Sequence, residues 1–93
     1  MVTRYVPDAG DLIWLTGERP ALVLSPRSYN TATGLAVMCP VTSKQKGEPV
    51  SGAILSGHLK SLDWRARKAT FVTTAPTTVL AEVRARVKPL LGV

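Results

Sequence analysis

Apolar residues gather in three short, uninterrupted runs in the first half of the chain: DLIWL at 11–15, PALVLS at 20–25 and LAVMCPVT at 35–42. Apolar runs of this length without alternation are typical of strands that are covered on both faces. The turn-forming residues between the first two runs predict a hairpin. The third run is expected to end or bulge near Pro40. The segment between the second and third runs, PRSYNTATG, is polar and predicts a loop.

The second half of the chain begins with a lysine-bearing, glycine-containing stretch at 43–52, which predicts a surface loop. Three further short strands are predicted in AIL, HLKSLDW and RKATFVT, the last two joined by a bend at WRAR. From Pro76 the period changes to that of a helix, in which Pro89 is expected to introduce a kink. One helical face collects Val79, Leu80, Val83, Val87, Leu90 and Leu91.

Several short strands followed by a terminal helix predict a mainly β fold, a small, strongly bent antiparallel barrel with a C-terminal α-helix. The apolar stripe of the helix is expected to pack on the barrel or on a second subunit. At 93 residues the chain is expected to form a single domain, residues 1–93.

The charge and the cysteine content limit the classes of binding partner and the cellular compartment that we expect. Twelve Lys and Arg against six Asp and Glu give a net charge of +6, which fits nucleic acid, anionic lipid or an acidic protein as partner, or simply a soluble basic surface. The single cysteine, Cys39, cannot form an internal disulfide and is interpreted as a small core residue. With no apolar run long enough to cross a bilayer and no signal-peptide core, the chain is expected in the cytoplasm and not in a membrane.

One basic residue stands at the entrance to the second strand. Arg19 directly precedes Pro20, whose ring fixes its own φ and pushes the preceding residue to an extended conformation. Arg19 is therefore expected at a strand edge with little backbone freedom. That placement suits a charged group that must be held in a fixed direction, and it also suits an ordinary arginine at the start of a strand.

Four segments in order, RYVPDAGDLIWL, GERPALVLSPRSYN, TGLAVMCPVTSKQKGEP and LSGHLKSLDWRAR, resemble the MazF/PemK family of toxin ribonucleases from toxin–antitoxin modules. The resemblance implies an SH3-like small barrel of the CcdB/PemK type that forms a homodimer. It implies cleavage of single-stranded RNA, often messenger RNA, at short sequences without a metal or other cofactor. It also implies neutralisation by a cognate, MazE-like antitoxin, whose acidic segment occupies the RNA groove.

The family's motif positions map onto named residues of this chain. The resemblance implies that Arg19 and Thr42 are catalytic, and that Ser43, Lys44, Lys46 and His58 contact RNA. A fixed guanidinium can grip two phosphate oxygens, and a threonine hydroxyl can donate to a third. The high pKa of arginine makes it a poor proton acceptor, so Arg19 fits charge stabilisation and general-acid work better than base work. With one His and one Cys and no clustered acids, no metal site is expected.

The chain also departs from the family pattern. The connections after Leu15 and after Pro49 are shorter than in relatives, and Gly57 stands where part of the family has a proposed catalytic aspartate. Two alternatives therefore stay open: a non-catalytic toxin that inhibits a protein target, and an RNA-binding barrel without cleavage. His58 also has a structural or solvated alternative. Trp14 is interpreted as a residue of the core or of a dimer interface, or as an exposed indole that stacks on a base. For the two arginines of WRAR, a structural role is favoured over contact with RNA.

Overall fold

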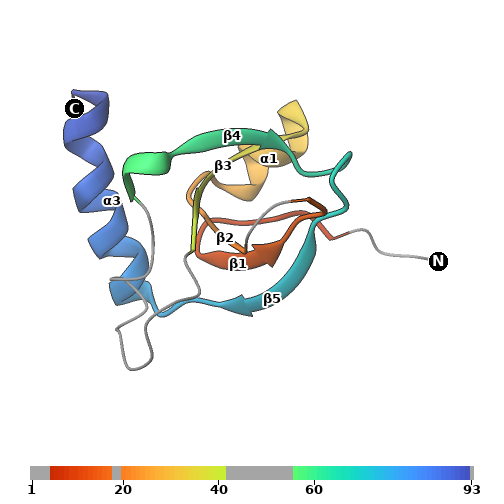
Figure 1. Cartoon of the computed structure of the whole chain (residues 1–93), viewed down its shortest axis with the longest axis horizontal. Helices are drawn as coiled ribbons and strands as arrows, with labels where there is room; N and C mark the ends of the chain where they lie inside the picture. Colours follow the sequence, from red (N-terminus) through yellow and green to blue (C-terminus); the bar gives the residue numbers. More distant parts are fainter. Residues whose placement is uncertain (1–4, 18–19, 42–55, 93) are drawn as a thin grey trace.

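Five strands form one antiparallel sheet in the computed structural model, which describes residues 5–17, 20–41 and 56–92. The strand order is β4-β3-β2-β1-β5, and Figure 1 shows the sheet curving from β4 at its upper edge to β5 at its lower edge. The predicted strands are confirmed in type, with shorter bounds, except that AIL at 53–55 lies outside the described residues. The strands are β1 Asp11–Trp14, β2 Ala21–Val23, β3 Leu35–Pro40, β4 Lys60–Asp63 and β5 Thr70–Thr74.

The predicted hairpin is confirmed, since β1 pairs antiparallel with β2 and Ile13 lies opposite Ala21. On the other side of β2, Ala21 lies opposite Pro40 of β3. One residue further out, the Val41 N–H donates to the Pro20 carbonyl at 2.8 Å. The first residues of β2 and the last residues of β3 therefore lie together at one end of the sheet.

Strands β2 and β3 are largely buried, as the continuous apolar runs predicted, whereas β4 and β5 are mostly exposed. Neighbouring residues of β2 divide between the two sides, because successive side chains of a strand point to opposite faces. The first core contains Ile13, Leu15, Ala21, Val23, Ala36, Met38 and Trp64. The second lies under the C-terminal helix and contains Leu22, Cys39, Ala75, Val83 and Val87.

The C-terminal helix, α3, spans Thr77–Leu91 and confirms the change of period after Pro76. Of the predicted apolar stripe, Val83 and Val87 are buried against the sheet, whereas Leu90 and Leu91 are 57% and 60% exposed. Pro89 lies in the last turn, and the helix ends at Gly92, whose φ of 72° is the left-handed conformation that glycine adopts without strain.

The prediction of a loop at 26–34 is wrong, because this segment contains the short helix α1, Arg27–Thr33. Extended Pro26 precedes the helix, and Gly34, with φ 75°, closes it by donating its N–H to the Asn30 carbonyl. The helix has no apolar stripe; its buried residue is Asn30. The sequence did contain a proline before the helix and a glycine after it, with seven residues between them, which are the signals that pattern analysis passed over.

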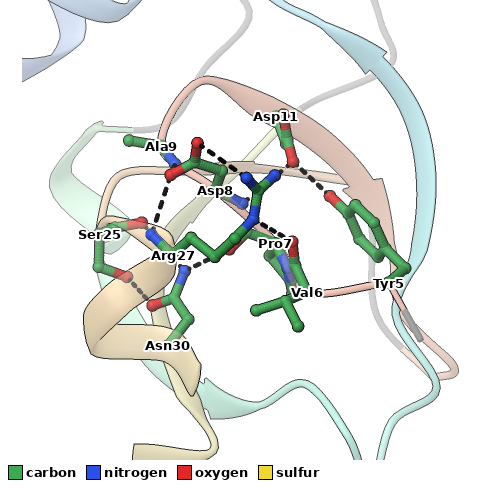
Figure 2. Close-up of polar contacts among 9 residues, drawn as sticks. All are labelled: Tyr5, Val6, Pro7, Asp8, Ala9, Asp11, Ser25, Arg27 and Asn30. Atoms are coloured by element: carbon green, nitrogen blue, oxygen red, sulfur yellow. Dashed lines mark hydrogen bonds and ion pairs between the residues drawn. The ribbon is translucent and has the colours of Figure 1, made fainter. Parts of the chain in front are cut away.

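Polar contacts of Asn30 hold α1 against the rest of the fold (Figure 2). The fully buried side-chain amide donates to the carbonyls of Pro7 and Ser25 at 2.8 and 3.0 Å, and its oxygen accepts from the Ser25 hydroxyl at 2.6 Å. The Trp64 indole N–H donates to the Asn30 main-chain carbonyl at 3.0 Å. One asparagine thus joins the N-terminal segment, the end of β2 and the turn after β4.

A second set of contacts ties the N-terminal segment to β1 and α1 (Figure 2). The Tyr5 hydroxyl donates to the carboxylate of buried Asp11 at 2.5 Å. Asp8 accepts the Arg27 backbone N–H at 2.9 Å and lies 3.8 Å from the Arg27 guanidinium. The segment preceding β1 is therefore fixed by hydrogen bonds at both ends.

Candidate functional site

The residues flanking the predicted catalytic pair meet at one end of the sheet. Arg19 and Thr42 themselves lie outside the described residues, as do Ser43, Lys44 and Lys46. Arg19 is followed directly by Pro20, and Thr42 is preceded directly by Val41. Pro20 and Val41 are joined by a backbone hydrogen bond of 2.8 Å. Each predicted catalytic residue is thus one peptide bond away from a member of a hydrogen-bonded pair.

His58 is described, and it lies in a short 3₁₀ turn, η1, Ser56–His58, where its side chain is exposed. This turn contacts β3 and α3. Because β4 runs antiparallel to β3, with Lys60 opposite Met38, the residues just before Lys60 lie toward the Val41 end of β3. His58 therefore comes from an element at the same end of the sheet as Pro20 and Val41.

Gly57, which stands where part of the family has aspartate, is exposed in the same turn. A Cβ atom added there would meet nothing within 4 Å. Crowding by the described residues therefore does not explain the missing side chain.

The WRAR turn, residues 64–67, packs against the beginning of the connection that leads from β1 to Arg19. The Thr16 N–H donates to the Arg67 carbonyl at 2.9 Å, and the Arg67 guanidinium donates to the Thr16 carbonyl at 3.4 Å. Arg65 lies 4.8 Å above the Trp64 ring and donates to the Thr31 carbonyl. These contacts agree with the structural role that the sequence favoured for the two arginines. The link from Arg67 to Thr16 was missed, since nothing in the spacing of the two residues indicates it.

Trp14 is 54% exposed, so its interpretation as a core residue is wrong. Cys39, by contrast, is buried as predicted, and burial raises the pKa of its thiol. Neither described helix combines the length and hydropathy of a membrane span. Within the described ranges, no three His, Cys, Asp or Glu residues gather closely enough to hold a metal ion.

Comparison with known proteins identifies the family. A family model described as "PemK-like, MazF-like toxin of type II toxin-antitoxin system" matches residues 5–91, most of the chain. The chain belongs to this family. The PemK/MazF assignment that four sequence segments indicated is therefore confirmed.

One Escherichia coli relative and two solved structures align with this chain over their whole length. The chain is 40% identical to the "Endoribonuclease toxin MazF" of Escherichia coli (strain K12), with 99% of this chain and 100% of the relative covered. Two crystal structures from Deinococcus radiodurans each superpose with a TM-score of 0.84 over 97% of this chain and 100% of theirs. They are MazE-MazF (Form-I) at 54% identity and MazF (Form-I) at 49% identity. These neighbours confirm the predicted fold class, a mainly β protein of the CcdB/PemK barrel type with a C-terminal helix.

The alignment with the Escherichia coli relative also bears on the shortened connections. It extends over 111 positions, more than the 93 residues of this chain. The Escherichia coli relative therefore has segments without a counterpart in this chain.

Proposed function

We propose that the protein is a toxin endoribonuclease that cleaves single-stranded RNA, messenger RNA in particular, at short specific sequences and without a metal ion. Membership of the PemK/MazF family and 40% identity to a protein named as an endoribonuclease toxin support this proposal. The observation that carries it is the hydrogen bond between Val41 and Pro20, because it joins the two strand ends that lead into Thr42 and Arg19. Pro20 and Val41, the described neighbours of the two residues in sequence, are therefore adjacent at this end of the sheet.

In the proposed reaction the 2′-oxygen of the substrate attacks the adjacent phosphorus and loses its proton. The bond from phosphorus to the 5′-oxygen breaks, and that oxygen leaves with a proton. The products are a 2′,3′-cyclic phosphate and a 5′-hydroxyl. Negative charge builds on the non-bridging oxygens, where preorganised donors contribute most. Arg19 would bind two of these oxygens and protonate or stabilise the leaving group, while the Thr42 hydroxyl would donate to the phosphate.

RNA binding around the phosphate is proposed for Ser43, Lys44, Lys46 and His58. Lys44 and Lys46 lie two and four positions after Thr42 in the sequence and would neutralise backbone phosphates. Exposed His58, in η1 at the same end of the sheet, would contact the RNA from the other side of β3. The net charge of +6 favours a polyanionic substrate.

We further propose that residues 1–93 form a single domain, that the protein acts as a homodimer in the cytoplasm, and that a MazE-like antitoxin neutralises it. The match of a Deinococcus radiodurans structure titled MazE-MazF supports the antitoxin partner. An acidic antitoxin segment would compete with RNA for the same basic surface, since both are anionic.

The proposal is tested by incubating the protein with end-labelled RNA oligonucleotides in the presence of EDTA. We expect fragments that end in cyclic phosphate, a loss of rate of roughly 10²- to 10³-fold in Arg19→Ala, and a loss of about 10- to 100-fold in Thr42→Ala. The matched control is Arg86→Ala, which removes an arginine that pairs with Glu82 on exposed α3 at 3.7 Å. It should cut at the wild-type rate.

Three other outcomes have distinct meanings. Undiminished cutting by Arg19→Ala would overturn the assigned mechanism. RNA binding without fragments would favour the RNA-binding barrel, and neither binding nor cutting would favour a toxin directed at a protein target.

A further inference from the structure

Trp14 carries a large apolar surface into solvent from a rigid position. Its neighbours in sequence, Ile13 and Leu15, are fully buried, whereas the Trp14 side chain is 54% exposed. Successive side chains of a strand point to opposite faces, so Trp14 lies on the face opposite Ile13, the same face as Leu12, which packs against the second core. β1 is also a central strand, paired with β2 on one side and β5 on the other, and Trp14 lies opposite Thr70 of β5. The indole is therefore held in place by the sheet.

The sheet register brings Trp14 next to the proposed cleavage site. Leu12 lies opposite Leu22 and Ile13 opposite Ala21, so one step further along β1 Trp14 comes alongside Pro20. Pro20 in turn accepts the hydrogen bond of Val41. Neighbouring strands are about 4.8 Å apart, so the Trp14 backbone is about one strand spacing from Pro20 and two from Val41. A nucleotide adjoining a phosphate gripped at that end of the sheet would be within reach of the indole.

The exposed indole is chemically suited to stack on a nucleobase. Indole offers a large π-face, and stacking of bases on aromatic side chains is a common means of holding single-stranded RNA. The chain is basic overall, with a net charge of +6, so the phosphates that accompany a base are attracted rather than repelled. Trp64, the other tryptophan of the chain, is 5% exposed, and Arg65 covers its ring, which leaves it no free face for a base.

We propose that Trp14 is a base-stacking residue for the single-stranded RNA substrate and holds the base of a nucleotide beside the scissile phosphate. This inference rests on the proposed function and adds a substrate-binding residue to it. Trp14 takes no part in proton transfer or charge stabilisation, so its loss weakens substrate binding and leaves the chemical step nearly intact.

The test measures binding and turnover separately. The binding probe is a fluorescein-labelled, 2′-O-methyl version of the oligonucleotide used in the cleavage assay, because methylation blocks the attacking oxygen. Trp14→Ala should raise Kd and KM by roughly 10- to 100-fold and leave kcat within about twofold, and Trp14→Phe should recover most of the affinity because it keeps a π-face. Tyr29→Ala is the matched control: it truncates an exposed aromatic side chain, 41%, on α1, which lies between β2 and β3 at the other end of the sheet, and it should bind like the wild type.

Intrinsic fluorescence gives a second readout. Since Trp64 is buried, quenching of tryptophan emission by the 2′-O-methyl RNA should come from Trp14 and should disappear in Trp14→Phe. The proposal is overturned if Trp14→Ala binds the probe as tightly as the wild type. It is also overturned if light scattering shows that Trp14→Ala has a changed oligomeric state and this change accounts for the loss of affinity. The indole would then be a contact between copies of the chain.

Failure of the proposed function would look different. If the wild type binds the probe but does not cut unmodified RNA, the proposed cleavage activity is excluded. The affinities of the wild type and Trp14→Ala for the probe still decide whether Trp14 stacks on a base. If the wild type neither binds nor cuts, both the stacking role and the RNA substrate are excluded.

Discussion

The hydroxyl of Tyr5 couples stability to alkaline pH. Burial raises the pKa of Tyr5, and its hydrogen bond to Asp11 and the negative charge of that carboxylate raise it further. An ordinary tyrosine has a pKa near 10, so above about pH 10 the unfolded chain gives up a proton that the folded protein retains. The stabilisation is complete below that pH and is lost as the pH rises. We expect the free energy of unfolding to fall by at most about 1.4 kcal/mol per pH unit above pH 10 from this group.

Urea denaturation of the wild type and Tyr5→Phe between pH 7 and pH 11 measures this coupling. Tyr5→Phe should be less stable by about 1 to 2 kcal/mol at pH 7, because the Asp11 carboxylate loses a donor, but its stability should decline less steeply above pH 10. Tyr29→Phe, which removes the other tyrosine, an exposed residue of α1, should keep the wild-type slope. An equally steep decline in Tyr5→Phe would assign the alkaline transition to other groups.

At the scale of elements, α1 depends on Asn30. Replacing Asn30 with alanine leaves the buried carbonyls of Pro7 and Ser25 without their side-chain donor and the Ser25 hydroxyl without its acceptor. An unsatisfied buried polar group costs roughly 1 to 3 kcal/mol, so we expect a loss of about 3 kcal/mol in the free energy of unfolding. Thr31→Ala, at the next and exposed position of α1, should change it by less than about 0.5 kcal/mol. A small change in Asn30→Ala, measured by denaturant unfolding, would show that α1 does not depend on this amide.

The contrast between α1 and the other elements shows what the sequence makes visible. Strands β1 to β3 and α3 bury apolar side chains, so they leave a hydrophobic pattern in the sequence, and they were predicted. α1 is held by a buried amide and by a glycine with positive φ, which leave no such period. At the site, Arg19 and Thr42 were assigned from the family motif. For Arg19 the sequence also offered a physical argument, because Pro20 restricts the backbone of the residue before it. The exposure of Trp14 and the contact of Arg67 with Thr16 depend on pairing between distant segments, which no local pattern encodes.

At the scale of the whole molecule, an apolar surface is uncovered at the C-terminal end of α3. Leu90 and Leu91 are more than half exposed there. Beside them is a groove of about 360 Å³ whose wall is largely apolar. Arg84 and Lys88 contribute basic side chains to it, and the apolar lining is Leu24, Val37, Leu59, Val87 and Leu91. Contiguous apolar surface of this kind is typical of a protein–protein interface, and the sequence had allowed the helical stripe a second subunit as partner.

Homodimerisation through this surface is a prediction that one substitution of an apolar residue by a charged one can test. Leu91→Lys would place an ammonium group in the interface; loss of the leucine contact alone is worth about 1.5 to 3 kcal/mol, and an unpaired charge adds to it. We expect the dissociation constant of the dimer to rise by at least about tenfold. Light scattering during gel filtration should then show the 10.0 kDa mass of one chain for Leu91→Lys and twice that mass for the wild type. Ala85→Lys adds the same charge at another exposed position of α3 and should remain dimeric. A dimer that persists in Leu91→Lys would place the interface on another face, and a monomeric wild type at micromolar concentration would exclude the homodimer itself.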